Sequence, residues 1–92
     1  MINNNFYSKY FKKFNYHTQN LDLTKIKKIE KLIINTSKKN KKIIICGNGG
    51  SAATSSHVSV DLTKNAKIKT INFNESDLIT CFANDYGYEN WV

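Results

Sequence analysis

Arginine and proline are absent from this chain of 92 residues, whose fourteen basic residues are all lysines, against seven acidic ones. A nucleic-acid surface usually contains arginine, because the guanidinium group pairs with phosphates and guanine edges. We therefore interpret the net charge of +7 as a solvated lysine-rich surface and expect no nucleic-acid partner. The densest basic run, residues 38–42, is interpreted as a helix-to-strand connection.

Cysteines are few, and long apolar runs are absent. Cys46 and Cys81 form neither a disulfide framework nor a Cys-x-x-Cys metal motif, so we predict reduced thiols in the cytoplasm. We interpret both as buried small apolar residues. No stretch approaches the ~20 apolar residues of a membrane span, and the first five residues do not resemble a secretory signal. We expect no membrane partner.

The first forty residues are predicted to form two helices. Over residues 1–17 aromatic side chains recur at helical spacing and define one face of a helix. The aromatic residues of this face are Phe6, Tyr7, Tyr10, Phe11 and Phe14. A second amphipathic helix is predicted over residues 22–39, capped by Asp22 or Thr24. A chain this short has few residues that could cover the aromatic face. We therefore expect the face to contact another helix, in the same subunit or a second one, and predict a homo-oligomer.

Strands and helices alternate from residue 41 onward. Residues 43–46 are predicted to form a strand buried on both faces, residues 52–64 a helix, and residues 67–73 a second strand. This order is typical of a parallel α/β crossover, and two strands alone correspond to the first part of such a domain.

One more short helix is expected after the second strand. It covers residues 77–82, and Asn74 or Ser76 can cap it. Asn84 and Asp85 then follow the helix in a turn, where they could cap the chain locally or reach back to bind substrate hydroxyls.

The segment Gly47-Asn48-Gly49-Gly50-Ser51 ends the first strand and opens directly into a helix. Glycines allow close backbone approach, and the free N–H groups of a helix start attract anions. Ser51 adds a hydroxyl that can also cap the helix, and Asn48 adds an amide for a sugar hydroxyl or carbonyl group. The sequence therefore predicts an anion site; a plain tight turn is the alternative.

A dinucleotide site is a further alternative. Gly47, Gly49 and Ala52 fit the spacing G-x-G-x-x-A. A dinucleotide site would also need an acidic residue at the end of the second strand, about 20 residues after the glycines, to bind the ribose. The candidates Glu75 and Asp77 lie somewhat farther along the sequence than that.

His57 and Asp61 lie four residues apart on the predicted helix, which places them on one face, one turn apart. Such a pair can bind one edge of a metal site or move a proton beside a ligand. A surface or structural pair is the alternative.

Two segments, taken in order, resemble the sugar isomerase (SIS) domain family, and within it the phosphoheptose isomerases. They are residues 45–53, followed by His57 and Asp61, and residues 78–89. The resemblance implies a flavodoxin-like α/β sandwich with a parallel sheet, preceded by two N-terminal helices that help build a homotetramer. Residues 1–40 would be these helices. Residues 41–92 would be the first part of the SIS domain, with its C-terminal half absent.

The resemblance also implies an activity and a site. The activity would be isomerisation of a phosphorylated sugar, D-sedoheptulose 7-phosphate, to an aldose heptose 7-phosphate for lipopolysaccharide or other surface sugars. His57 would be a zinc ligand, and Asp61 stands where these isomerases usually have a glutamate that binds the metal and moves the proton. The residues implied to bind substrate are Asn48, Gly49, Gly50, Ser51, Asn84 and Asp85.

Asp61 is one methylene shorter than glutamate, which changes its reach, and catalytic geometry is sensitive to about 1 Å. The family's Ser/Thr-rich phosphate loop and further zinc ligands are expected to lie in the half that this sequence lacks. A non-catalytic SIS-type module that binds a sugar phosphate or a protein partner therefore stays as the second interpretation.

Overall fold

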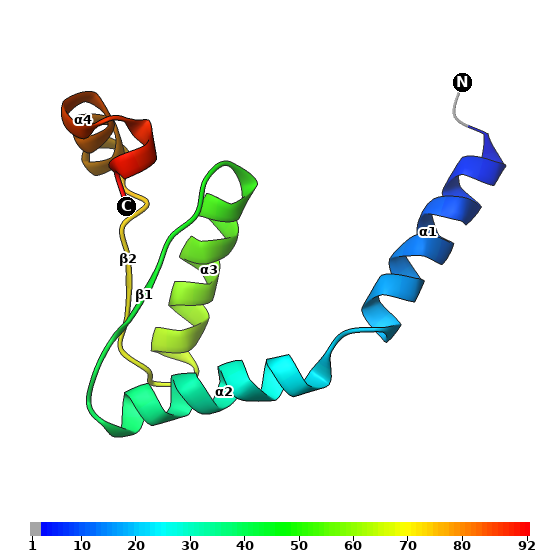
Figure 1. Cartoon of the computed structure of the whole chain (residues 1–92), viewed down its shortest axis with the longest axis horizontal. Coiled ribbons are helices and arrows are strands. Elements are labelled where there is room, and N and C mark those ends of the chain that lie inside the picture. The colour runs from blue at the N-terminus through cyan, green and yellow to red at the C-terminus, as the bar shows by residue number, and fades with distance from the viewer. Residues whose placement is uncertain (1–2) are drawn as a thin grey trace. The chain divides into compact units, whose positions relative to one another are not determined.

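The structure of the chain is a computed structural model that describes residues 3–92, with the elements labelled in Figure 1. Residues 1 and 2, where the predicted N-terminal region begins, lie outside the described residues. The chain divides into two compact units, Met1–Lys31 and Leu32–Val92. Among residues 3–92 no helix is both long and apolar enough to cross a membrane.

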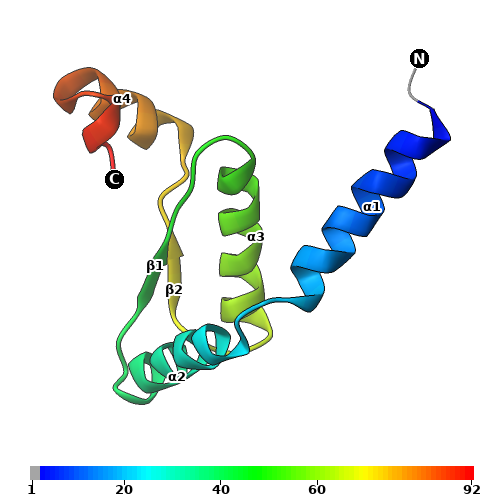
Figure 2. The ribbon, with the colours of Figure 1, turned by 45° about the vertical axis from the view of Figure 1, so that its right-hand side comes forward.

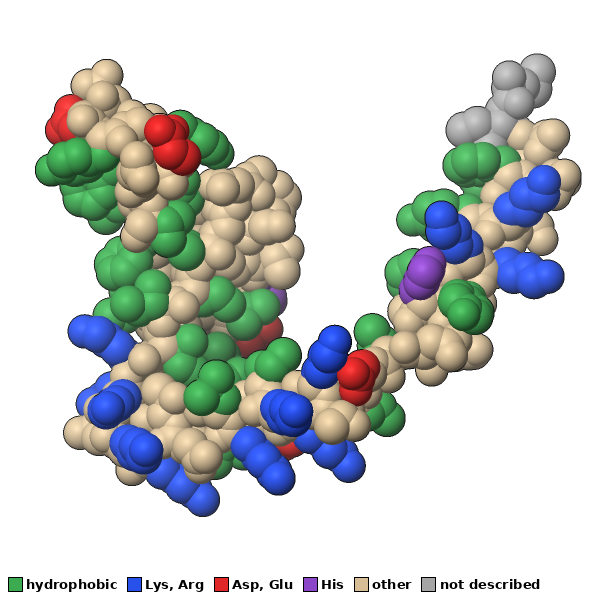
Figure 3. Space-filling model, in the orientation of Figure 1, with side chains coloured by type: hydrophobic (Ala, Val, Ile, Leu, Met, Phe, Trp, Pro, Cys, Tyr) green, Lys and Arg blue, Asp and Glu red, His purple; other side chains and the backbone are tan. Residues whose placement is uncertain are grey.

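The first unit contains α1 (Asn4–Gln19) and the start of α2 (Leu23–Lys38). Asn3 caps α1, since its side-chain oxygen accepts from the N–H of Phe6 at 3.1 Å. Asp22 caps α2 as predicted, accepting from the N–H of Thr24 at 3.0 Å. The predicted aromatic face of α1 is exposed, with Phe11 58% accessible. Figure 3 shows hydrophobic side chains and lysines along this helix.

The second unit is built on a parallel pair of strands, β1 (Ile43–Ile45) and β2 (Thr70–Asn72), connected by α3 (Gly50–Lys64). Figure 2 shows α3 alongside both strands. The register pairs Ile45 with Asn72. This confirms the α/β fold class. The second strand is shorter than the predicted 67–73, and Lys67, with a φ of +57°, does not have extended backbone.

Only one face of the sheet is covered by a helix among the described residues. Asn72 bonds to α3, so its partner Ile45 faces that helix while Ile44 faces the other side. Ile44 is 54% exposed, and the prediction of a strand buried on both faces is therefore wrong. On the open side lies an apolar pocket of about 340 Å³, lined by Ile44, Cys46, Phe73, Leu78, Phe82, Trp91 and Val92.

The chain ends with α4 (Ser76–Tyr86) and the short 3-10 helix η1 (Tyr88–Asn90). Glu75 caps α4 by accepting from the N–H of Leu78 at 3.3 Å, so the predicted caps Asn74 and Ser76 are wrong. Asn74 is engaged elsewhere, and Ser76 is already helical. Because α4 continues to Tyr86, Asn84 and Asp85 lie inside the helix rather than after it.

Candidate functional site

The glycine-rich loop connects β1 to α3 through a tight turn. The N–H of Ser51 donates to the carbonyl of Asn48 at 3.1 Å, and Gly49 has φ +57° and ψ −128°, as at the second position of a type II′ turn. Glycine is the residue that adopts this backbone readily. Helix α3 therefore begins at Gly50, with Gly49 as its N-cap, and the prediction that Ser51 caps the helix is wrong.

Three successive N–H groups of this loop have no hydrogen-bond acceptor in the part of the chain that the structure describes. Among residues 3–92, the N–H groups of Asn48, Gly49 and Gly50 donate to no backbone or side-chain oxygen. They lie at the positive end of the α3 dipole and at the carboxyl end of the parallel strands, where open α/β sheets bind ligands. The loop can therefore receive a negatively charged or carbonyl oxygen.

A polar cluster beside the loop was not predicted. Ser55 is only 5% exposed, and its hydroxyl lies 3.0 Å from Oδ1 of Asn74. Asn72 donates to the carbonyl of Ile45 at 2.9 Å and accepts from the hydroxyl of Ser56 at 3.3 Å. The signal for it was the alternation at the end of β2, where polar residues occupy every second position and so share the face toward α3.

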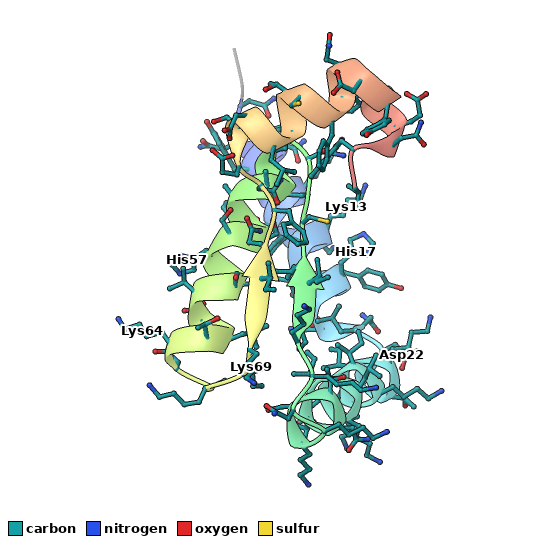
Figure 4. The ribbon with its side chains drawn as sticks, turned by 90° about the vertical axis from the view of Figure 1, so that its left-hand side faces the viewer. Lys13, His17, Asp22, His57, Lys64 and Lys69 are labelled. Atoms are coloured by element: carbon teal, nitrogen blue, oxygen red, sulfur yellow. The ribbon has the colours of Figure 1, made fainter. Side chains whose placement is uncertain are left out.

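His57 and Asp61 come together on α3 as their spacing predicted. Nε2 of His57 lies 3.7 Å from Oδ2 of Asp61, and the two side chains are 78% and 53% exposed. Asn65 donates to the other oxygen of Asp61 at 3.3 Å. Figure 4 shows His57 directed away from the strands. His57 follows Gly50 by seven residues, about 10 Å along the helix axis, so the pair and the loop are separate parts of the site.

The donor atoms of this pair fit two positions of a zinc site. Zinc bonds of roughly 2.0–2.2 Å in a tetrahedral arrangement place neighbouring ligand atoms ~3.4 Å apart, close to the separation of His57 and Asp61. Within residues 3–92 no group of three His, Cys, Asp or Glu residues could hold a metal ion. The described residues thus bring together two donor atoms of the kind that zinc binds, and no third beside them.

Asn84 and Asp85 make local hydrogen bonds. Nδ2 of Asn84 donates to Oδ1 of Asp85 at 3.2 Å, and the thiol of Cys81 donates to Oδ2 of Asp85 at 3.7 Å. Within residues 3–92 no hydrogen bond joins either side chain to the glycine-rich loop. Cys81 is exposed, so its interpretation as a buried apolar residue is wrong, while Cys46 is partly buried.

The reactivity of Cys81 should depend on Asp85. The charge of Asp85 raises the pKa of the Cys81 thiol, and desolvation, the hydrogen bond to Asp85 and the charge of Asp77 add to it. Replacing Asp85→Asn removes the main cause and lowers this pKa, so iodoacetamide should label Cys81 several-fold faster at mildly alkaline pH, because the thiolate is the nucleophile. Peptide mass spectrometry measures the rate, with Cys46 as internal control; an unchanged rate at Cys81 would contradict the assignment.

Comparison with known proteins adds an independent finding. A family model described as "SIS domain" matches residues 7–84. The phosphoheptose isomerase of Akkermansia muciniphila is 36% identical over 70 residues, covering 70% of this chain and 37% of that protein. That of Helicobacter pylori (strain ATCC 700392 / 26695) is 42% identical over 64 residues, covering 63% and 33%.

The phosphoheptose isomerase of Clostridium acetobutylicum is 31% identical over 77 residues, covering 74% of this chain and 38% of that protein. The chain thus spans about a third of the length of the curated relatives it matches. No solved structure matches it.

Proposed function

This chain belongs to the SIS domain family, and we propose that it carries the substrate loop and the acid–base pair of a phosphosugar isomerase resembling D-sedoheptulose 7-phosphate isomerase. The reaction would convert a ketose into an aldose heptose 7-phosphate. The observation that carries this proposal is the row of free N–H groups of Asn48, Gly49 and Gly50 at the start of α3.

The loop would bind oxygens of the phosphosugar. Backbone N–H groups that are already aimed at the ligand stabilise a developing negative charge without reorganising. The amide of Asn48 and the hydroxyl of Ser51 would bind sugar hydroxyls, and Asn84 and Asp85 would add further contacts, as the family resemblance implies. These groups would orient the sugar for proton transfer.

Asp61 would move the proton. Its carboxylate would take a proton from the first carbon of the ketose, giving an enediol, and return it to the second carbon, while the hydroxyl proton of the first carbon passes to the second oxygen. The exposure of Asp61 leaves it open to substrate, and the hydrogen bond from Asn65 orients it. Zinc held by His57 and Asp61 would supply polarisation of the carbonyl group when bound.

The proposal also covers the location, the pathway and the oligomeric state of the enzyme. We place it in the cytoplasm, in the synthesis of surface sugars such as lipopolysaccharide, as a homotetramer assembled through residues 1–40. The exposed aromatic face of α1 supports assembly, because contiguous exposed apolar surface marks interaction sites.

A second candidate is a non-catalytic module that binds a sugar phosphate or a protein partner. The observation that favours it is the metal donor set, since residues 3–92 supply only His57 and Asp61 where a catalytic zinc usually has three protein ligands.

Two measurements test the proposal. Calorimetry of the 92-residue chain should show binding of sedoheptulose 7-phosphate and none of unphosphorylated sedoheptulose. Turnover is measured in a chimera in which this chain replaces the matched segment of the A. muciniphila relative, with the intact relative as positive control. Turnover by the chimera supports the isomerase, and binding without turnover supports a module that binds sugar phosphates. The absence of both would contradict the isomerase and the sugar-phosphate module and leave the module that binds a protein partner.

A further inference from the structure

Asn74 lies two residues past the last pair of the sheet, directly opposite the loop. The register pairs Ile45 with Asn72, so the next position on the same face pairs Gly47 with Asn74. At this position the side chain of Asn74, rather than the backbone of β2, makes the hydrogen bonds to the backbone of Gly47. The N–H of Gly47 donates to Oδ1 of Asn74 at 3.0 Å, and Nδ2 of Asn74 donates to the carbonyl of Gly47 at 2.5 Å. Both peptide groups of Gly47 are therefore engaged by one amide.

The amide of Asn74 is itself fixed by its neighbours. Around its Oδ1 lie the N–H of Gly47, the hydroxyl of Ser55 at 3.0 Å and Nδ2 of Asn72 at 3.2 Å. The N–H of Asn74 in turn donates to Oδ1 of Asn72 at 3.0 Å. Donors surround the oxygen while the nitrogen faces a carbonyl, so the hydrogen-bond pattern defines one orientation of the amide. Ser55 belongs to α3, so this cluster ties the helix to the end of β2.

The position of Gly47 determines where the rest of the loop can run. A side chain at Gly47 would meet the carbonyl oxygen of Ser51 at 2.4 Å, so the first turn of α3 folds closely over it. The turn at Gly49, with the free N–H groups of residues 48–50, lies between Gly47 and Ser51. An anchored loop holds such donors in place before the ligand arrives, which reduces the ordering cost of binding.

We infer that Asn74 is a positioning residue, which holds the glycine-rich loop in the conformation that receives a phosphosugar. This inference deepens the proposed function and rests on it for the identity of the ligand. Asn74 would act through Gly47 and would not touch the substrate. The amide suits this position because it offers an acceptor to the N–H of Gly47 and, beside it, a donor to the carbonyl group of the same residue.

The variants Asn74→Ala and Asn74→Asp test this in the 92-residue chain. Alanine removes both hydrogen bonds to Gly47, and aspartate keeps the acceptor but loses the donor. The matched control is Asn90→Ala, which removes a hydrogen bond from an asparagine side chain to the carbonyl of Tyr86, 2.8 Å long, in the same unit.

Hydrogen exchange by NMR reports the loop directly. In the wild type, the N–H of Gly47 should exchange much more slowly than the free N–H of Asn48. In Asn74→Ala it should exchange at least about tenfold faster, the loss expected for one hydrogen bond, with a smaller change in Asn74→Asp. The N–H of Ile43, which donates to Lys69 at 2.9 Å at the other end of the sheet, is the internal reference and should change less. Calorimetry should show a Kd for sedoheptulose 7-phosphate raised by a similar factor.

Equal exchange at Gly47 and Asn48 in the wild type would overturn the inference, as would an unchanged Gly47 rate in both Asn74 variants. A parallel acceleration at Gly47 and Ile43 would indicate general destabilisation instead and would also overturn it. If Asn74→Ala does not fold, the exchange rates of the wild type and of Asn74→Asp decide whether Asn74 holds the loop. A wild-type chain without affinity for the phosphosugar would contradict the proposed function, while the exchange rates would still decide the role of Asn74 in the loop.

Discussion

Replacing Gly47→Ala is expected to destabilise the Leu32–Val92 unit by about 3 kcal/mol and to displace the glycine-rich loop. The added Cβ would lie 2.4 Å from the carbonyl oxygen of Ser51 and 2.6 Å from its carbonyl carbon. These are backbone atoms in the first turn of α3, so no side chain can rotate away. Asn74 holds the peptide groups of Gly47 on both sides, which prevents Gly47 from moving instead.

The matched control, Gly50→Ala, should shift stability in the opposite direction. At Gly50 an added Cβ meets nothing within 4 Å, and the residue is the first of α3. Alanine there should stabilise the helix by ~0.5–1 kcal/mol, because glycine is the more flexible residue in the unfolded chain. Urea unfolding followed by circular dichroism should give a lower midpoint for the first variant and a higher one for the second. Equal shifts would contradict the described turn.

Much of the fold could be predicted from residue periodicity. The helices and both strands follow from apolar spacing and glycines, because those patterns reflect local geometry. The exposure of Ile44 could not be predicted this way. A run of isoleucines indicates that a strand prefers to be covered, but the cover has to come from another element, and α3 reaches only one face.

In the candidate site, too, the features set by local spacing could be predicted and those set by tertiary contacts could not. The pairing of His57 with Asp61 depends only on helical spacing, and the structure confirms it. The role of Asn74 depends on the register of two strands that are far apart in sequence, and a single asparagine near a helix start looks equally like a cap. The sequence pattern favoured the cap because it is the local solution, whereas the tertiary hydrogen bonds to Gly47 engage both ends of the amide.

In the chimera, Asp61→Asn is expected to lower kcat by roughly 10²–10⁴-fold, the usual contribution of a positioned general base. The amide has nearly the same shape but cannot take a proton from carbon. The side chain is half exposed on the outer face of α3, so the substitution should change stability by less than ~0.5 kcal/mol and KM only slightly. Asp61→Glu should keep turnover, because it retains the carboxylate and restores the length usual in the family that this chain resembles.

Asp77→Asn is the matched control for the chemistry. It makes the same carboxylate-to-amide change in the first turn of α4, where Oδ1 accepts from the N–H of Leu78 at 3.1 Å. An amide oxygen can still accept that bond, so this variant should keep the wild-type kcat. Because both carboxylates are exposed and both variants lose one negative charge, a selective loss of kcat at Asp61 would report the role of this carboxylate in the reaction, as base or as zinc ligand, rather than folding or net charge. Equal rates in the two variants would mean that another group is the base.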